Sequence, residues 1–118
     1  MAAPNLRAPT AVTGKTALAT LTTSLASVVT NAAASGKVLK INTIRAANTA
    51  GAAVTVDAAI LRGATTCYLI KGGSVDSGKT LIVTNKDEYI YLEEDDILQA
   101  KAAAGTSIDL TINYEEIS

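Results

Sequence analysis

The sequence lacks several residue types on which protein chemistry often depends. Its 118 residues contain no histidine, no phenylalanine and no tryptophan, and the formal net charge is −1. Without histidine, the chain has neither the commonest general base nor the commonest metal ligand. The near-neutral charge gives no electrostatic basis for binding nucleic acid or an anionic membrane. These absences argue against an enzyme and against nucleic-acid or membrane partners, and we expect no cofactor.

Cysteine and long apolar runs are also scarce. Cys67 is the single cysteine, so an internal disulfide is impossible, and we interpret Cys67 as a small apolar residue within a strand. The N-terminal residues contain no apolar core of signal-peptide length, and no segment approaches the ~20 apolar residues of a membrane span. We therefore expect synthesis in a cytoplasm and no membrane-spanning segment.

Alanine and threonine are abundant, at about a third of the chain, which is well above average usage. Alanine buries little surface, because each missing methylene forgoes roughly 0.8 kcal/mol of transfer free energy. The length predicts one domain. A single domain with such a core is expected to gain stability from burial against copies of itself or against a larger scaffold.

Residues 37–61 predict two long strands joined by a polar turn. Residues 54–60 place apolar side chains at every second position, which is typical of a half-buried strand. The turn begins at Asn48 and ends at Gly51, two residue types that tolerate positive φ. In the first strand the apolar phase slips by one residue, which predicts a β-bulge near Asn42-Thr43. We expect these two strands to form a central β-hairpin.

Residues 16–35 fit two interpretations. Apolar side chains recur at spacings of three and four, as in a helix, but many residues are β-branched and disfavour a helix. We favour two short strands, at 16–22 and 24–30. From residue 66 to the end, short strands alternate with Gly, Asn, Asp and Ser turns. The whole pattern predicts an all-β, antiparallel β-sandwich or jelly-roll-like domain over residues 16–118, preceded by an extended N-terminal arm over residues 1–15.

One sequence motif resembles a nucleotide-binding loop. Residues 73–80, GSVDSGKT, match the phosphate-loop pattern G-x-x-x-x-G-K-[ST], and a predicted strand at 66–71 precedes them. The motif also needs a helix directly after the lysine, whereas residues 81–84 are mostly β-branched and a turn follows at Asn85. We interpret the match as a coincidence within a connection that starts with a break at Gly72-Gly73.

Four consecutive acids, Glu93 to Asp96, could in principle bind a cation. Calcium loops place their oxygen ligands at alternate positions around a sharp glycine turn, and this run does neither. Consecutive acids are more typical of a solvated turn whose repulsion is screened by water. We predict no metal site, and the scattered tyrosines do not suggest an aromatic-walled cleft for a sugar.

Residues 1–15 contain both prolines and show no hydrophobic period. Such a segment is typical of a disordered terminus, and equally of an arm that becomes ordered on a neighbouring subunit. About 15 extended residues can reach up to ~50 Å. As an arm, this segment offers Leu6, Pro9 and Val12 as candidate interaction residues.

The order of motifs along the chain resembles a known family. A turn at Gly36-Lys37 leads into VLKINTIRAANTAG; AAVTVDAAILRGATTCYLI and TLIVTNKDEYIYLEEDDIL follow, and the chain closes with AAAGTSIDLTINYEEIS. This order is similar to that of small β-sandwich virion structural proteins of tailed bacteriophages, above all those of cyanophages. Members often have glycine at the position of Asp95, and Asp can adopt the left-handed conformation that such a turn needs.

The resemblance implies a non-enzymatic structural role in the virion. It implies first a cement or decoration protein on the outer capsid surface, which binds the major capsid protein, commonly as a homotrimer at three-fold positions. Two alternatives stay open. One is a neck, tail or fibre component, and the other is a host-surface or carbohydrate-binding module that uses the turn from Tyr89 to Asp96.

Overall fold

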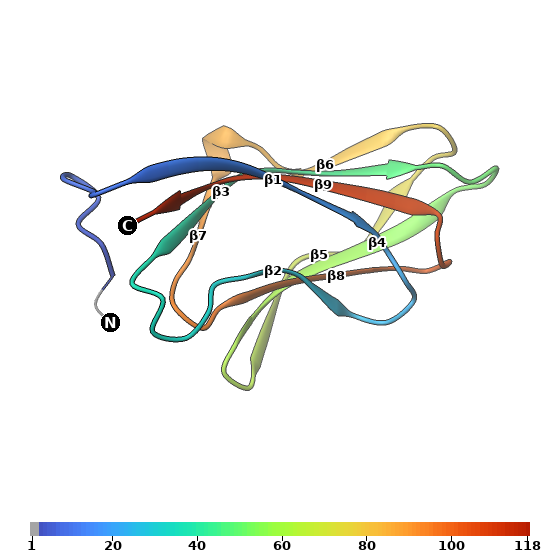
Figure 1. Cartoon of the computed structure of the whole chain (residues 1–118). Coiled ribbons are helices and arrows are strands. Elements are labelled where there is room, and N and C mark those ends of the chain that lie inside the picture. Colours follow the sequence, from blue (N-terminus) through green and yellow to red (C-terminus); the bar gives the residue numbers. More distant parts are fainter. Residues whose placement is uncertain (1–2) are drawn as a thin grey trace.

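Two antiparallel sheets pack face to face in the computed structural model, which describes residues 3–118 (Figure 1). One sheet has the order β1-β9-β3-β6, with β7 also paired to β3, and the other has the order β2-β8-β4-β5. The strands are β1 (Val12–Thr20), β2 (Ala26–Thr30), β3 (Val38–Asn48), β4 (Val54–Arg62), β5 (Thr65–Val75), β6 (Thr80–Thr84), β7 (Ile90–Leu92), β8 (Ile97–Ala102) and β9 (Ile108–Ile117), with a 3-10 helix, η1 (Lys86–Glu88), before β7. The all-β sandwich expected from the sequence is confirmed.

The connectivity is that of a jelly roll. The antiparallel pairs β1–β9, β2–β8, β3–β6 and β4–β5 are those of one long hairpin whose turn lies between β4 and β5. Winding this hairpin distributes its paired strands alternately between the two sheets, which is how double-sheet jelly rolls are built. Strand β7 is an addition to that plan, because it pairs only with the first part of β3.

The predicted central hairpin is wrong, although both of its strands exist. β3 pairs with β9, β6 and β7, whereas β4 belongs to the other sheet and pairs with β5 and β8. The polar segment after Asn48 therefore crosses between the sheets. Each strand has one strongly apolar face, and these faces meet across the core instead of lying side by side in one sheet.

The bulge predicted near Asn42-Thr43 is confirmed. The register of β3 against β9 shifts between Ile41 and Thr43, so Asn42 is the extra residue. The buried side chains of β3 change phase at this point, from Leu39 and Ile41 before the bulge to Ile44 and Ala46 after it. One inserted residue thus keeps both halves of a long strand facing the core.

Residues 16–35 form strands and no helix, as favoured from the sequence, but their bounds differ. β1 begins at Val12, four residues before the expected start, and β2 is only Ala26–Thr30. The expected break at Gly72-Gly73 is also wrong, because β5 continues through both glycines to Val75. Gly72 has a positive φ of 70°, and its N–H donates to the Asp57 carboxylate at 2.7 Å, so the glycine pair forms an irregularity within the strand.

The core lies between the sheets and consists of aliphatic side chains and alanines. The largest side chains that are fully buried are Ile41, Ile44, Leu92, Leu98, Ile108, Leu110 and Ile112. Valines, further leucines and alanines fill the remaining inward positions. No helix in the described part of the chain is long and apolar enough to cross a membrane.

Candidate interaction surface

Strand β1 forms one free edge of the five-stranded sheet. It pairs with β9 over nine residues without a shift of register, and no other strand of residues 3–118 pairs with it. Its inward-facing alanines, Ala17 and Ala19, are partly buried against the core, whereas Leu18 points outward and is 79% exposed. Leu18 has the highest exposed fraction among the large apolar residues of the described chain.

The candidate interaction residues from the sequence lie at and before the start of β1. Val12 is the first residue of the strand, opposite Ile117, and is 52% exposed. Leu6 is 46% exposed, and Pro9 is half-buried. Leu18 was not among the residues singled out from the sequence. The signal was present, because the alternation in residues 17–19 places two small alanines on one face and leucine on the other.

The extended arm over residues 1–15 is not confirmed. Val12 to Lys15 belong to β1, and the segment before them turns back on itself, since the N–H groups of Arg7 and Ala8 donate to the side chain and carbonyl of Asn5. Backbone hydrogen bonds then join Ala11 to Ser118 at the other end of the chain. Residues 1–2 of the predicted arm lie outside the described residues. Whether the segment binds a neighbouring subunit stays a prediction.

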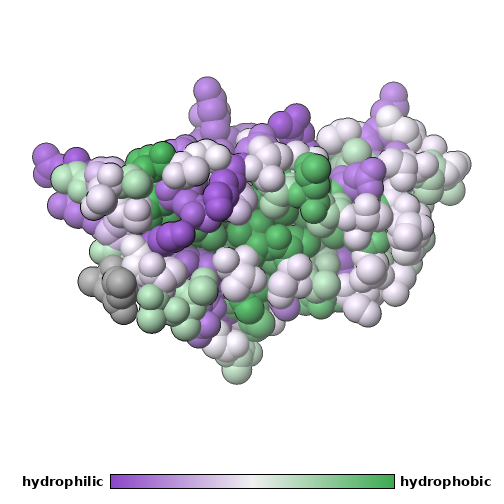
Figure 2. Space-filling model, viewed as in Figure 1, coloured by the Kyte–Doolittle hydropathy of each residue, from purple (hydrophilic) through white to green (hydrophobic). Residues whose placement is uncertain are grey.

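Hydrophobic surface gathers along the edge that carries β1 and β2. Figure 2, which views this edge, shows hydrophobic residues along its middle and hydrophilic ones towards one end. Ala17, Ala19 and Val28 are the partly buried contributors to the core on these two strands. A shallow hollow of about 390 Å³ also lies on the outer side of β1 and β9, and it is lined by Leu18, Ala19, Thr20, Asp109, Leu110 and Thr111.

The hydrophilic end of this edge contains an ion-pair cluster around Glu116. Its carboxylate binds the ammonium groups of Lys15, at 2.9 Å, and of Lys37, at 3.0 Å. The hydrogen bonds from Lys15 and then Lys37 hold the pKa of Glu116 below its ordinary value, and Glu116 in turn raises the pKa of Lys15. The charge of Lys15 on the edge strand is therefore already paired within the same chain.

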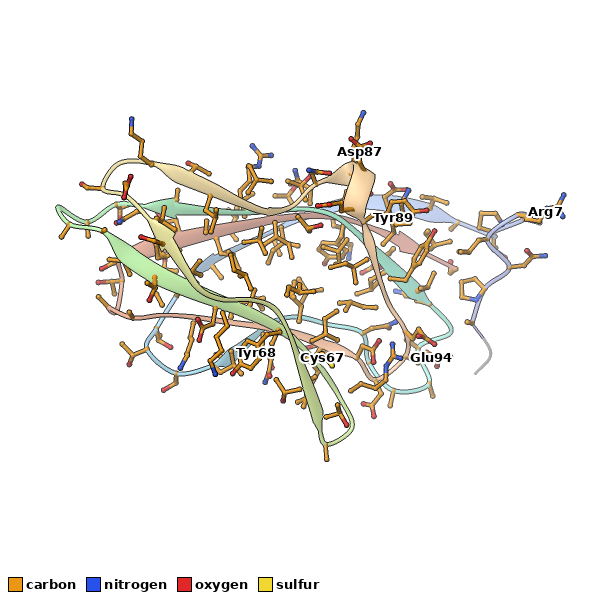
Figure 3. The ribbon with its side chains drawn as sticks, turned by 180° about the vertical axis from the view of Figure 1, so that it is seen from behind. Arg7, Cys67, Tyr68, Asp87, Tyr89 and Glu94 are labelled. Atoms are coloured by element: carbon orange, nitrogen blue, oxygen red, sulfur yellow. The ribbon has the colours of Figure 1, made fainter. Side chains whose placement is uncertain are left out.

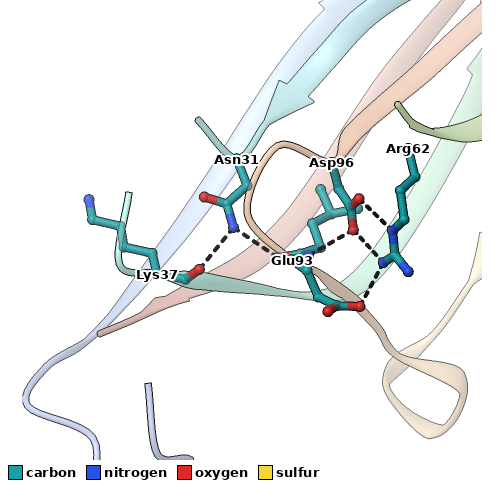
Figure 4. A network of polar contacts seen from close by, with 6 residues as sticks. Asn31, Lys37, Arg62, Glu93 and Asp96 are labelled. Carbon is teal, nitrogen blue, oxygen red and sulfur yellow. Dashed lines mark hydrogen bonds and ion pairs between the residues drawn. The ribbon is translucent and has the colours of Figure 1, made fainter. Parts of the chain in front are cut away.

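The acidic turn is closed by an arginine (Figure 4). The guanidinium of Arg62 donates from Nε and Nη2 to the two carboxylate oxygens of Asp96, at 2.8 and 2.6 Å, and also to Glu93. Asp96 additionally accepts the N–H of Glu93, and its side chain is only 1% exposed. The Arg62 hydrogen bonds are the main cause that keeps the pKa of Asp96 below its ordinary value.

The same turn is tied to the loop after β2. The side-chain amide of Asn31 donates to the carbonyls of Lys37 and Leu92, at 3.0 Å each. Asp95 has a φ of 72°, which is the left-handed conformation that the sequence led us to expect at this position. The turn is therefore a structural junction, and in the described chain no group of three or more acidic or cysteine side chains has a metal-binding arrangement.

The phosphate-loop match has no structural counterpart. Its first residues belong to β5, the N–H of Lys79 closes a turn on the Asp76 carbonyl, and β6 starts at Thr80. A strand thus follows the lysine where a nucleotide site needs a helix N-terminus. The match covers the end of β5 and its connection to β6, as the predicted connection between two strands requires, and this connection crosses from one sheet to the other.

Two tyrosines form a small exposed cluster beside β7. The rings of Tyr89 and Tyr91 meet edge to face, with centroids 5.4 Å apart, and the ammonium of Lys40 lies 4.4 Å from the Tyr89 centroid. Burial of the hydroxyl, and then Tyr89, raises the pKa of Tyr91. Cys67 lies away from this cluster, next to Tyr68 (Figure 3). It is a residue of strand β5, as expected from the sequence, but it is exposed and so does not pack as an apolar residue of the core.

No protein-family model matches the chain, and no curated protein matches it either. The surface described above is therefore the basis for a functional proposal, together with the resemblance noted from the sequence.

Proposed function

We propose that this chain is a non-enzymatic structural protein of a tailed-phage virion, a cement or decoration protein that binds the outer surface of the major capsid shell. The resemblance of its motif order to small phage virion proteins supports this role. The observation that carries the proposal is the exposure of Leu6, Val12 and Leu18 in and just before one free strand edge.

The physical reason is the cost of leaving such residues in water. Burial of apolar surface contributes roughly 25 cal/mol per Å², and Leu18 alone is 79% exposed. Monomeric proteins expose single apolar residues routinely, but a row of them beside unpaired backbone is typical of a surface that binds another protein. A protein that contacts several capsid subunits at once would also gain from multivalent attachment.

The test is the binding of purified protein to capsids that lack it. Deletion of residues 1–11 removes Leu6 and Pro9 but leaves all of β1 in place. A deletion through residue 15 would also remove the first four residues of β1. We expect the shortened protein to keep its far-ultraviolet circular dichroism spectrum and to lose co-sedimentation with capsids. Leu69→Asp is the matched control, because Leu69 is an exposed apolar residue of β5 in the other sheet.

Two results would overturn the proposal or part of it. Full capsid binding by the shortened protein would remove the N-terminal segment as the attachment site. Co-purification of the native protein with tails, and not with emptied heads, would favour the neck, tail or fibre alternative over the capsid surface.

The carbohydrate-binding alternative has one specific observation in its favour, the exposed pair Tyr89 and Tyr91. Sugars stack on the faces of aromatic rings, and Lys40 already covers one face of Tyr89. That leaves Tyr91 as the critical ring. Glycan binding that is lost in Tyr91→Ala and retained in Tyr68→Ala would establish this second function. Tyr68→Ala is the control, because Tyr68 is an exposed tyrosine outside the pair and, like Tyr89, has a lysine over its ring.

A further inference from the structure

The free edges of the two sheets differ in how they could accept another strand. Natural proteins protect edge strands by making them short, bulged or charged. β2 has five residues and a register shift, β6 has five residues and a shift, and β5 is interrupted by two shifts. β1 has nine residues, a regular register, no proline and one charge, on Lys15, that is paired with Glu116. Among the described strands, β1 is the edge left open.

The hydrogen bonds at the ends of β1 show which backbone groups face outward. Ala11 and Ser118 exchange both of their backbone hydrogen bonds, and Leu21 donates to Ile108. In an antiparallel ladder the bonded residues alternate, so the odd-numbered residues between Ala11 and Leu21 bond to β9. The backbone N–H and C=O groups of the even-numbered residues therefore point to the open edge, and these are Val12, Gly14, Thr16, Leu18 and Thr20.

We propose that β1 pairs antiparallel with β1 of a second copy of this chain, across a two-fold axis at Thr16. Thr16 is the centre of Val12–Thr20, so this register uses the whole strand. Each outward-pointing residue then faces another one, with Thr16 opposite Thr16, Gly14 opposite Leu18 and Val12 opposite Thr20. Every outward N–H and C=O group of the strand finds a partner, and the two five-stranded sheets become one continuous sheet.

The side chains fit this register. Gly14 has open space where a side chain would be, with no heavy atom within 4 Å of a Cβ built there, and the exposed Leu18 of the second copy would lie over it. Lys15 faces Ala17 and not another lysine. A register centred on Lys15 would instead place two lysines directly opposite each other, which is unfavourable.

The surroundings of the strand supply further apolar contact. Pairing of two strands alone makes a small interface. The partly buried Ala17, Ala19 and Val28 lie along the same open edge, where Figure 2 shows hydrophobic residues. Approach of a second copy along β1 would cover this surface as well, which makes the dimer more than a ladder of hydrogen bonds.

The first test is the mass of the full chain in solution by light scattering at micromolar concentration. One chain has a mass of 12.0 kDa, so the dimer is expected at about 24 kDa, twice that value. Leu18→Lys should shift the protein to the monomer mass, because it places a charge over Gly14 of the partner. Ile82→Lys is the matched control and should stay dimeric, since Ile82 is 48% exposed on β6 at the opposite edge of the same sheet.

The second test reads the register directly. In a Cys67→Ser background, Thr16→Cys should form a disulfide between copies on mild oxidation, because directly opposite Cα atoms lie about 5.5 Å apart, within disulfide reach. Thr20→Cys is the control. Its two copies would lie eight residues apart along the ladder, about 26 Å, so it should not cross-link at the same protein concentration.

A monomer mass, a trimer mass, or a dimer that Leu18→Lys leaves intact would each overturn the proposal. So would equal cross-linking of the Thr16 and Thr20 variants. The dimer differs from the trimer that the family resemblance implies, and it does not depend on the virion role. It would cover Val12 and Leu18, so a dimer would attach to the capsid through Leu6 and Pro9 of the N-terminal segment, which the deletion of residues 1–11 tests. Failure of capsid binding would leave the dimer proposal standing, and a monomer or trimer mass would leave the capsid proposal open.

Discussion

Replacement of Asn48 by alanine tests how the chain crosses from one sheet to the other. Asn48 ends β3 and is 3% exposed. Its amide nitrogen donates to the carbonyls of Ala52 and Val75, at 2.8 Å each, and its side-chain oxygen accepts the N–H of Ala50 at 2.8 Å. One side chain thus joins the crossing after β3 to the end of β5 in the other sheet.

The expected loss follows from what alanine leaves unpaired. A buried group without its hydrogen bond costs about 1–3 kcal/mol, and the bond to the Val75 carbonyl is buried. The other two partners, the Ala52 carbonyl and the Ala50 N–H, lie in a more open turn, where water can replace part of the lost hydrogen bonding. Loss of each of these two bonds therefore costs about 0.5–1 kcal/mol. Asn48→Ala should therefore lower the free energy of unfolding by about 2–5 kcal/mol.

Asn48→Asp separates hydrogen bonding from side-chain volume. The carboxylate has nearly the shape of the amide, but it would place negative charge against two carbonyl oxygens and donate nothing to them. It should be more destabilising than alanine near pH 7. The difference should narrow as the pH falls, because burial raises the pKa of the new carboxyl and its protonated form can donate one bond.

The measurement is urea unfolding at one protein concentration for all variants, since any dimer makes stability concentration-dependent. Asn85→Ala is the control, because the Asn85 side chain accepts one exposed hydrogen bond, from the N–H of Asp87. It should cost about 1 kcal/mol or less. A loss under 0.5 kcal/mol for Asn48→Ala, or an aspartate no worse than alanine, would refute the reasoning.

Three further predictions concern acid stability, packing and thiol chemistry. Because Arg62 lowers the pKa of the Asp96 carboxyl in the folded state, the ionised carboxylate stabilises the fold at a pH above the pKa that Asp96 has in the unfolded chain. This stabilisation is lost as the pH falls through the lower pKa of the folded state. Asp96→Asn should therefore make the free energy of unfolding depend less on pH in the acid range, as measured by urea unfolding. Gly73→Ala should lower the melting temperature, because its Cβ would collide with the Ile70 side chain; an unchanged temperature contradicts the packing. The exposed Cys67 should react with a thiol reagent without denaturant, and a protected thiol would contradict its position.

Local pattern was sufficient to predict the strands and one irregularity within them. The alternation of apolar residues identified both strands of the 37–61 region, and the slipped phase located the bulge at Asn42. β-branched residues correctly outweighed the helical spacing in residues 16–35. These features depend on side-chain direction and backbone preference within a few residues, which a sequence displays directly.

The identity of neighbouring strands could not be read in the same way. A turn such as the one after Asn48 has the same composition whether it closes a hairpin or crosses between sheets. The ion pair that closes the acidic turn joins Arg62 to Asp96, 34 positions apart. No local pattern contains such a pairing, because it exists only once the winding of the jelly roll brings β4 and β8 together.

The candidate surface shows the same division. The sequence alone determined that β1 carries leucine on one face and alanine on the other, and that a segment with both prolines precedes it. Tertiary structure decided that β1 lies at a sheet edge and that one row of its backbone groups faces outward. The physical reason is that exposure of a strand edge depends on which strands pair, and pairing is fixed by burial of the whole core, not by the strand itself.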